Sequence, residues 1–323
     1  MNNHFEQIDL AKLAEEYWDR LIAKPRTDSK NIFDRLNDAI GHSSFNALLK
    51  AKKDFLNSLN DEKFLKAIII GKPDELEKYA QKVDNTLFWD EKKSESTPFG
   101  KKVLKIFHYD GFRASKRLGF WVAESLKIKS CPYCNAQYII NTNEKVYHTF
   151  DHFFPKAIYP YLSVSFYNLI PACNTCNQTK SNKLTSLTTH WHPYFGDDLM
   201  SKFQFEIEPK SCVDFALDKY KTDAILKIQT KSQSNPMVKT HIETFNLEDQ
   251  YKVHTDIAAE TIWKSMVYVN SYKTELKNLF AAIGLTEPEI KRIIIGNYSE
   301  PEDVHKRPLS KLTSDLAKDL RLI

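Results

Sequence analysis

The sequence contains no run of about eighteen consecutive apolar residues, which excludes a helix long enough to cross a bilayer. Its first twenty residues are acidic and amphipathic, whereas a secretory signal has a basic stretch followed by an apolar one. There is no internal repeat, no low-complexity tract and no phosphate-binding G-x-x-x-x-G-K-[ST] run, so any ATP dependence would have to come from a partner. We therefore expect a cytoplasmic protein without a membrane partner.

Cysteine is scarce, and its placement is informative. Four of the five cysteines form two C-x-x-C pairs, Cys131 with Cys134 and Cys173 with Cys176, and only Cys212 is left over. In a cytoplasmic protein such pairs indicate metal binding rather than disulfides. Each pair offers two thiolates from one tight turn, and together they complete a tetrahedral site. The sequence predicts a structural zinc ion here; the alternative is a pair of buried or redox-active dithiols.

The remaining composition is that of a globular protein with an uneven charge distribution. Of the 323 residues, 42% are hydrophobic and 27% are charged, and the length suggests two or three structural units. Between Lys101 and His190 there are 12 Lys and Arg against 4 Asp and Glu, although the whole chain carries only +4. A basic segment of this kind suits a phosphate backbone. A solvated lysine-rich helix face is the alternative explanation.

Hydrophobic periodicity divides the chain into three predicted units. Residues 1–126 follow a helical rhythm, 127–195 hold the cysteine pairs, and 196–323 read as α+β, mostly helical after residue 240. Within them we predict helices over about 10–21, 31–40, 45–59, 115–126 and 250–283, and strands over 137–140, 146–150, 203–207 and 224–230. The fold class expected is α+β.

Three short motifs lie between and around the cysteine pairs. They are Asp151-His152, Asn168-Leu169, and a Cys173-Asn174-Thr175-Cys176-Asn177-Gln178-Thr179-Lys180 run that begins a helix. Their order and spacing resemble the cysteine-framed HNH endonucleases, in which a D-H pair, an N-L pair and a C-x-x-C-[HN]-x-x-K helix start follow one another. The resemblance covers about fifty residues, 131–183. It implies a treble-clef ββα-metal nuclease core with a four-cysteine zinc knuckle.

The resemblance also implies a role for each motif residue. His152 would be the general base that deprotonates water, and Asn168 would orient the imidazole or the loop that carries it. Asp151 would be the anionic ligand of a catalytic cation. Asn177, which stands where the family often has its last histidine, would bind the same cation through its amide oxygen. An amide oxygen is a harder ligand than imidazole, which favours Mg²⁺ or Mn²⁺ over zinc in that position.

The chemistry of phosphodiester hydrolysis is consistent with these roles. Histidine titrates near neutrality and can accept the proton of water, and a divalent cation can stabilise charge on the phosphate and the leaving oxygen. Asp151 and His152 are adjacent, so on a regular strand their side chains point to opposite faces. Both can serve one site only if the backbone bends there or the metal lies at the strand's end.

Each residue taken alone also has an ordinary structural explanation. An Asp-His pair is often a surface ion pair, and Asn177 could be a helix N-cap. Lys156, Lys180 and Lys183 are candidate phosphate contacts, with solvated lysines as the alternative. The pattern assigns no definite role to the remaining polar candidates, which are His148, His190, His192 and Cys212.

The function predicted is a metal-dependent endonuclease acting on nucleic acid, with DNA favoured over RNA. A weaker similarity in size and layout, and the CPYCN start, points to the HNH effectors of Septu-type and retron-associated anti-phage systems, which would imply an ATPase partner. The alternatives are a restriction endonuclease, a toxin that cuts RNA such as tRNA, a non-catalytic zinc module that binds nucleic acid, and a scaffolding subunit.

Overall fold

The computed structural model describes residues 4–24, 29–142, 145–217, 228–232 and 235–323. They fall into two compact units whose segments are not consecutive in the sequence. The larger unit comprises residues 8–127 and 140–196, and the smaller unit comprises 1–7, 128–139 and 197–323. The contacts thus place residues 128–139 with the C-terminal region, and they group residues 140–196 with the N-terminal helices. None of the described helices is long and apolar enough to span a membrane.

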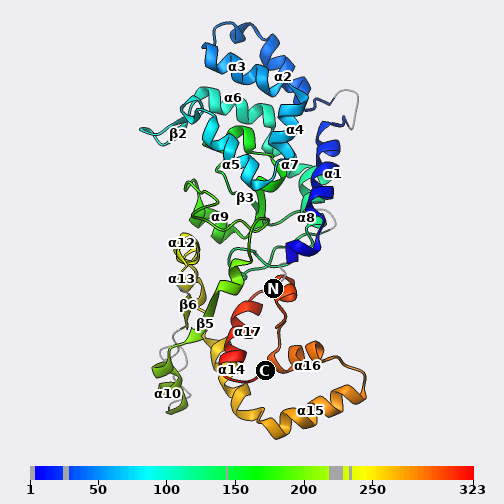
Figure 1. The fold of residues 1–323 in the computed structure, drawn as a ribbon, viewed down its shortest axis with the longest axis vertical. Helices are drawn as coiled ribbons and strands as arrows, with labels where there is room; N and C mark the ends of the chain where they lie inside the picture. The colour runs from blue at the N-terminus through cyan, green and yellow to red at the C-terminus, as the bar shows by residue number, and fades with distance from the viewer. Residues whose placement is uncertain (1–3, 25–28, 143–144, 218–227, 233–234) are drawn as a thin grey trace. The chain divides into compact units, whose positions relative to one another are not determined.

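The larger unit is built mainly of helices (Figure 1). They are α1 Leu10–Ile22, α2 Ile32–Gly41, α3 Lys50–Leu59, α4 Glu62–Ile70, α5 Pro73–Lys82, α6 Pro98–Phe107, α7 Tyr109–Ala114, α8 Trp121–Ser125 and α9 Asn174–Lys180. Asp9 caps α1 and Thr97 caps α6, where Pro98 occupies the first turn. The helix predicted over 115–126 is a π-helical turn, Lys116–Phe120, followed by α8.

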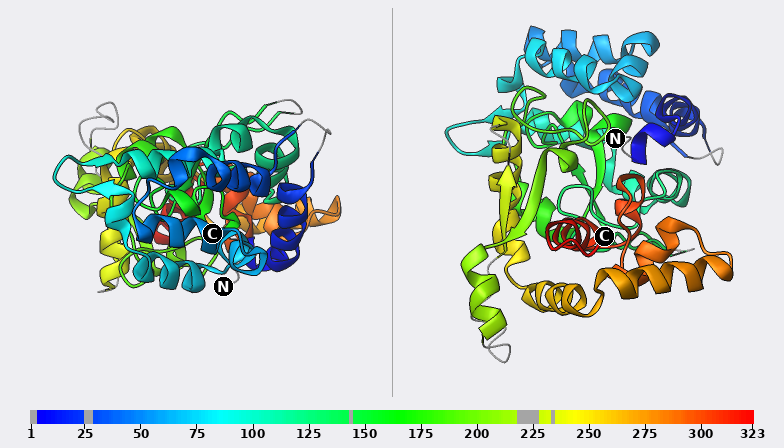
Figure 2. Two further views of the ribbon diagram at one scale, coloured as in Figure 1. Left: turned by 90° about the horizontal axis from the view of Figure 1, so that it is seen from above. Right: turned by 60° about the horizontal axis from the view of Figure 1, so that its bottom comes forward.

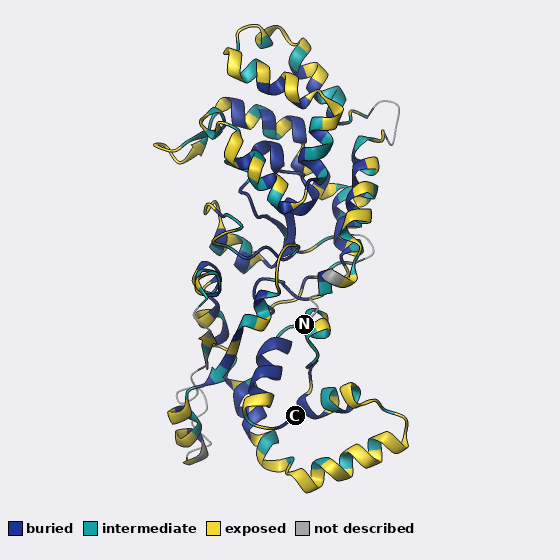
Figure 3. Ribbon diagram, in the orientation of Figure 1, coloured by how far each residue is buried: buried dark blue, intermediate teal, exposed yellow. Residues whose placement is uncertain are grey.

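Two small antiparallel sheets accompany these helices. Strands β1 (Trp89–Asp90) and β2 (Glu95–Ser96) form a short hairpin, and β3 (Thr149–His152) pairs with β4 (Leu169–Ala172). The β3–β4 pair is buried along almost its whole length (Figure 3). Helices α2 to α6 gather at one end of it in Figure 1 and in the right-hand view of Figure 2. The chain order β3, β4, α9 is the ββα arrangement that the sequence predicts.

The segment between β3 and β4 is fixed by the helical scaffold. The hydroxyl of Tyr17 in α1 donates to the Val164 carbonyl at 2.7 Å, and the Ser165 hydroxyl donates to the Ile68 carbonyl in α4 at 2.7 Å. Both bonds are buried and join residues far apart in the sequence. The carbonyl of Ser163, between Leu162 and Val164, is therefore held by a rigid frame.

The smaller unit is mixed α and β. Its elements are β5 Phe203–Ile207, α10 Pro209–Leu217, β6 Ile228–Ser232, α12 Pro236–Phe245, α13 Leu247–Tyr251, α14 Thr255–Val267, α15 Asn270–Ala282, α16 Glu287–Ile295 and α17 Ser310–Asp319. Strands β5 and β6 are antiparallel and α17 packs on β5. Of the strand predicted over 224–230, residues 224–227 lie outside the described residues.

Several predicted elements differ from the structure. The helix predicted over 45–59 begins only at Lys50, and the strand predicted over 146–150 lies at Thr149–His152. Residues 137–140 form no strand ladder, because only single bridges occur there, Ser130 with Tyr138 and Asn141 with Val146. The helix predicted over 250–283 is interrupted before Thr255 and again at Tyr268–Val269. Helix α14 buries one face, whereas α15 has no buried residue (Figure 3). A break between them lets the chain leave the core, which one straight helix would not allow.

Candidate active site

The β3–β4 register brings the D-H and N-L motifs together. Thr149 pairs with Ala172, Asp151 with Ile170, and His152, the last residue of β3, with Leu169. The pairing is regular through His152, so its side chain and that of Asp151 point to opposite faces. The His152 ring packs against Tyr109 of α7, and the Asp151 carboxylate contacts Lys180 of α9. The sequence left two ways for Asp151 and His152 to serve one site, a bend in the strand or a metal at its end. The strand does not bend at these residues, and both residues lie at its end.

His152 is held as a neutral imidazole. Its Nε2 lies 2.9 Å from the Ser163 carbonyl oxygen. Because a carbonyl can only accept, Nε2 carries the proton and Nδ1 keeps its lone pair. Nδ1 makes no hydrogen bond to the part of the chain that the structure describes. Burial lowers the pKa of His152 to about 3, with further lowering by the charges of Lys156 and Lys180, so the ring is unprotonated at neutral pH.

Asn168 acts on the loop rather than on the imidazole. Its Oδ1 accepts from the Phe154 amide at 2.7 Å, and its Nδ2 donates to the carbonyls of Phe154 at 3.1 Å and Leu162 at 2.9 Å. The side chain is fully buried. These bonds tie the end of β3 to the segment whose Ser163 carbonyl holds His152. The structure therefore places Asn168 where it can orient the loop, and its catalytic part stays a prediction.

Lys180 does not lie where a phosphate contact would. Its side chain is 1% exposed, and its Nζ lies 3.2 Å from Asp151 Oδ1 and 2.6 Å from the His152 carbonyl oxygen. The Lys180 ammonium is buried and already bonded to a carboxylate and a carbonyl, so it is not accessible to a substrate phosphate. The phosphate contact predicted for Lys180 is therefore wrong. The bonds instead join α9 to the end of β3. Lys183 is exposed and Lys156 half-buried, so both remain accessible for the predicted phosphate contact.

Asn177 lies half-buried on α9, which packs against β3. Cys173 is the N-cap of this helix, because its sulfur accepts from the Cys176 amide at 3.4 Å. Asn177 is thus inside the helix, and the alternative that it caps the helix start is wrong. Asp151 and Asn177 offer only oxygen ligands from these two elements, a donor set that fits Mg²⁺ or Mn²⁺.

The four paired cysteines form one cluster. All four are buried, and their sulfur atoms lie within 4.8 Å of one another. Tetrahedral zinc with Zn–S bonds of about 2.3 Å places its sulfurs roughly 3.8 Å apart, so the cluster fits this ion. None of the four is in a disulfide. This donor set supports the predicted structural zinc over the dithiol alternative, and Cys212 lies outside it.

Backbone bonds shape the first cysteine turn. The Cys131 amide donates to the Gln137 carbonyl at 2.9 Å, and the Asn135 amide donates to the Cys131 carbonyl at 2.7 Å. Asn135 has a φ of 51°, in the left-handed region that asparagine tolerates better than most residues. Its side-chain oxygen accepts from the Lys311 amide at 2.9 Å. The turn that presents Cys131 and Cys134 is therefore fixed by the smaller unit itself.

Three histidines without an assigned role, His148, His190 and His192, lie in different surroundings. His192 is buried, with Nε2 2.9 Å from the Tyr167 carbonyl oxygen, and its Nδ1 accepts from the Tyr194 amide at 3.2 Å. Burial lowers its pKa to about 3. His148 packs edge-on against Phe150, and burial lowers its pKa to about 4. His190 is half-exposed, with Nδ1 2.8 Å from the Thr189 hydroxyl.

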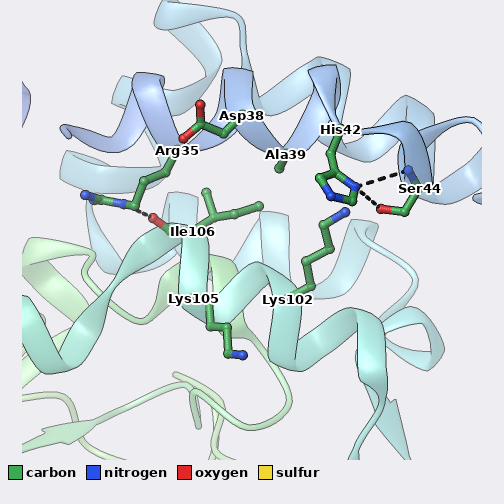
Figure 4. A pocket seen from close by; sticks show the side chains of 8 residues that line it. All are labelled: Arg35, Asp38, Ala39, His42, Ser44, Lys102, Lys105 and Ile106. Atoms are coloured by element: carbon green, nitrogen blue, oxygen red, sulfur yellow. Dashed lines mark hydrogen bonds between the residues drawn. The ribbon is translucent and has the colours of Figure 1, made fainter.

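A basic pocket lies between α2 and α6 of the larger unit (Figure 4). It has a volume of about 400 Å³, and its lining includes Ala39 of α2 and Ile106 of α6. Arg35, His42, Lys102 and Lys105 also line it, and the Lys102 side chain extends towards His42. Asp38, the acidic residue of the lining, pairs with Lys30 at 2.7 Å. The pocket therefore presents net positive charge.

Two groups that contact His152, the Ser163 carbonyl and the Tyr109 ring, could not be predicted from the sequence. The Ser163 carbonyl that sets the His152 tautomer belongs to the backbone, which any residue could supply. Tyr109 lies more than forty positions before His152 and outside every motif. Only the folded chain brings them to the imidazole.

Comparison with known proteins agrees with this geometry. Residues 131–183 match the family described as HNH endonuclease. No curated protein and no solved structure matches the chain. The matched segment contains the two cysteine pairs, both strands of the β3–β4 sheet and α9. Residues 131–183 are therefore the segment of this chain that is similar to the HNH endonuclease family.

Proposed function

We propose that the chain is a metal-dependent endonuclease that hydrolyses phosphodiester bonds of nucleic acid, with DNA favoured. The observation that carries the proposal is the placement of His152 within a segment that matches the HNH endonuclease family. Its Nε2 donates to the Ser163 carbonyl, which fixes the ring at the end of β3 and leaves the Nδ1 lone pair to accept a proton. A fixed imidazole with one nitrogen lone pair free is the geometry that general-base activation of water requires.

In the proposed reaction, His152 Nδ1 removes a proton from water while the water oxygen forms a bond to phosphorus. The bond from phosphorus to the 3′ oxygen breaks and this oxygen takes a proton from solvent water, which leaves 5′-phosphate and 3′-hydroxyl ends. Asp151 and Asn177 would hold a Mg²⁺ or Mn²⁺ ion, which when bound supplies positive charge for the phosphate and the leaving oxygen. Lys180 fixes the Asp151 carboxylate, and Asn168 fixes the loop behind His152.

The proposal is tested by incubating the zinc-loaded protein with plasmid DNA and with structured RNA, each with Mg²⁺, Mn²⁺ or EDTA. We expect cleavage only with a divalent cation, and we expect EDTA to stop cleavage before it removes the structural zinc. End-group analysis should find 5′-phosphates. Nucleic-acid binding without cleavage under every metal condition would instead support a non-catalytic zinc module. Cyclic 2′,3′-phosphate ends would indicate metal-independent RNA chemistry.

We further propose that the α2–α6 pocket grips the phosphate backbone of the substrate. Lys102 extends into the pocket, whereas the Lys105 side chain points from α6 away from α2 (Figure 4). Neither forms an ion pair within the described chain, so both ammonium groups are available to a phosphate backbone that passes over α6. Replacing both by glutamate should weaken binding to a duplex and reduce the slope of log affinity against log salt by about 2, since each lost phosphate contact removes roughly 0.9. Fluorescence anisotropy at several salt concentrations measures both.

The matched control for the pocket reverses two exposed lysines of the smaller unit, Lys210 and Lys277. It changes the net charge of the protein by the same amount but leaves the pocket intact. If both double variants lower the affinity for the duplex and its salt dependence equally, the pocket does not bind the phosphate backbone specifically, and the effect comes from the overall charge of the protein.

A protein partner would account for a separate feature of the smaller unit. Helices α14 and α15 and their junction expose several large apolar side chains, namely Trp263, Met266, Val267, Val269, Leu279 and Ile283. Exposed apolar side chains in such number are typical of interaction surfaces. The ATPase partner and the anti-phage role stay predictions, and the neighbouring genes would decide between this context and a restriction enzyme or toxin.

A further inference from the structure

Helix α7 lies outside the HNH segment but packs on its catalytic strand. The Tyr109 ring is 4.6 Å from the His152 ring, centroid to centroid, and the two planes are inclined at 65°. One turn later, the Phe112 ring lies 5.6 Å from that of Phe150. The same face of β3 that carries His152 is therefore covered by two aromatic residues of α7.

The Tyr109 ring has a second contact, with Lys156. The ammonium nitrogen of Lys156 lies 4.0 Å from the ring centroid, which is cation–π geometry. Lys156 is half-buried, and burial lowers the pKa of its ammonium, an effect that Asp110 opposes. A lysine side chain has four rotatable bonds, so a ring at this distance removes much of its freedom.

The position of Tyr109 is itself fixed. His108 joins α6 to α7 in the left-handed conformation, with φ 54° and ψ 50°. Its imidazole covers Gly111, where any Cβ would collide with it. Burial raises the pKa of the Tyr109 hydroxyl to about 12, so the phenol stays protonated, and its hydroxyl donates to the Phe150 carbonyl of β3 at 3.4 Å.

We propose that Tyr109 is a positioning residue of the nuclease centre: its single ring holds both the His152 base and the Lys156 cation, and so fixes their separation. Lys156 would contact a substrate phosphate beside the base. The inference rests on the proposed function and extends it, because it assigns part of the active centre to a helix that the family domain does not contain. Precise placement of reacting groups contributes strongly to rate, so loss of the ring should affect catalysis more than folding.

The test compares Tyr109→Leu with Tyr109→Phe and with Phe88→Leu. Phenylalanine keeps both ring contacts and should retain kcat and KM within about twofold. Leucine removes the ring and should lower kcat/KM by about 10- to 100-fold, as expected for a lost cation–π contact together with a displaced base. Phe88 is a fully buried residue of the same unit whose ring contacts are with Phe55, Phe99 and Tyr161, and among the described residues it has no ring contact with Tyr109 or His152. Its replacement should lower the melting temperature without a comparable loss of kcat/KM.

A second comparison separates the two contacts of the ring. In the wild-type background, Tyr109→Leu should raise KM through Lys156 and lower kcat through His152. In a Lys156→Gln background the cation is already absent, so Tyr109→Leu should leave KM unchanged and still lower kcat. If Tyr109 were purely structural, Tyr109→Leu would lower the melting temperature, and its effects on kcat and on KM would be the same with Lys156 present as with Gln at that position. If Tyr109→Leu does not retain zinc and fold, Tyr109→Met gives the same test, since methionine fills irregular space.

The outcomes distinguish this inference from the proposed function. Equal kcat/KM for the wild-type protein and Tyr109→Leu overturns the inference, as does a loss no larger than that of Phe88→Leu. A wild-type protein that cleaves no nucleic acid overturns the proposed function itself.

Discussion

Replacing His152 by alanine is expected to slow cleavage by about 10²- to 10⁴-fold, the usual contribution of a positioned general base. The substitution removes the atom that accepts the water proton. Zinc content, circular dichroism and affinity for nucleic acid should stay close to those of the wild-type protein, because Asp151, Asn177 and the cysteines are retained. Single-turnover rates at saturating Mg²⁺ or Mn²⁺ measure the effect. Asp151→Ala and Asn177→Ala should differ by also raising the cation concentration required.

His192→Ala is the matched control for this experiment. His192 is as fully buried as His152, and its Nε2 also bonds a backbone carbonyl at 2.9 Å. Its loss should destabilise the fold to a similar degree yet keep the cleavage rate within a few-fold. Cleavage by the His152→Ala protein at the wild-type rate would falsify the mechanism. A similar loss for both variants would indicate damage to the fold rather than removal of a base.

Replacing Cys176 by serine is expected to remove the bound zinc and to unfold or aggregate the region around the cysteine pairs. Zinc binding by four thiolates is coupled to folding, with apparent free energies of about 10–16 kcal/mol in small zinc domains, and a hydroxyl is a poor replacement for a thiolate. The same result is expected for Cys131→Ser, whose sulfur lies in the same buried cluster. Elemental analysis should find about one zinc per wild-type chain, and thermal denaturation reports the loss of stability.

The control for the zinc prediction is Cys212→Ser. Cys212 is half-buried and lies outside the cluster, so its replacement should leave zinc content unchanged. A wild-type protein that folds well without zinc, and whose stability Cys131→Ser and Cys176→Ser do not alter, would contradict the structural zinc site.

The sequence alone was sufficient for the elements whose signals are local. Two C-x-x-C pairs identify the metal ligands, because side chains three positions apart in a tight turn converge without help from the rest of the fold. The D-H, N-L and N-x-x-K motifs in fixed order identify the domain and the ββα order of its elements. The amphipathic rhythm from Leu10 to Leu21 identifies α1, because helical periodicity appears directly in the order of the residues.

The tertiary structure decided what depends on contacts between distant residues. The tautomer and neutrality of His152 come from burial and from the Ser163 carbonyl, and Tyr17 and Ile68 fix that segment from helices far away in the sequence. Lys180 matches a phosphate-binding lysine in the sequence, yet the fold buries it against Asp151. Tyr109 belongs to no motif. A side chain's type limits the chemistry it can perform, but burial and the neighbours supplied by other elements determine which of its roles it takes.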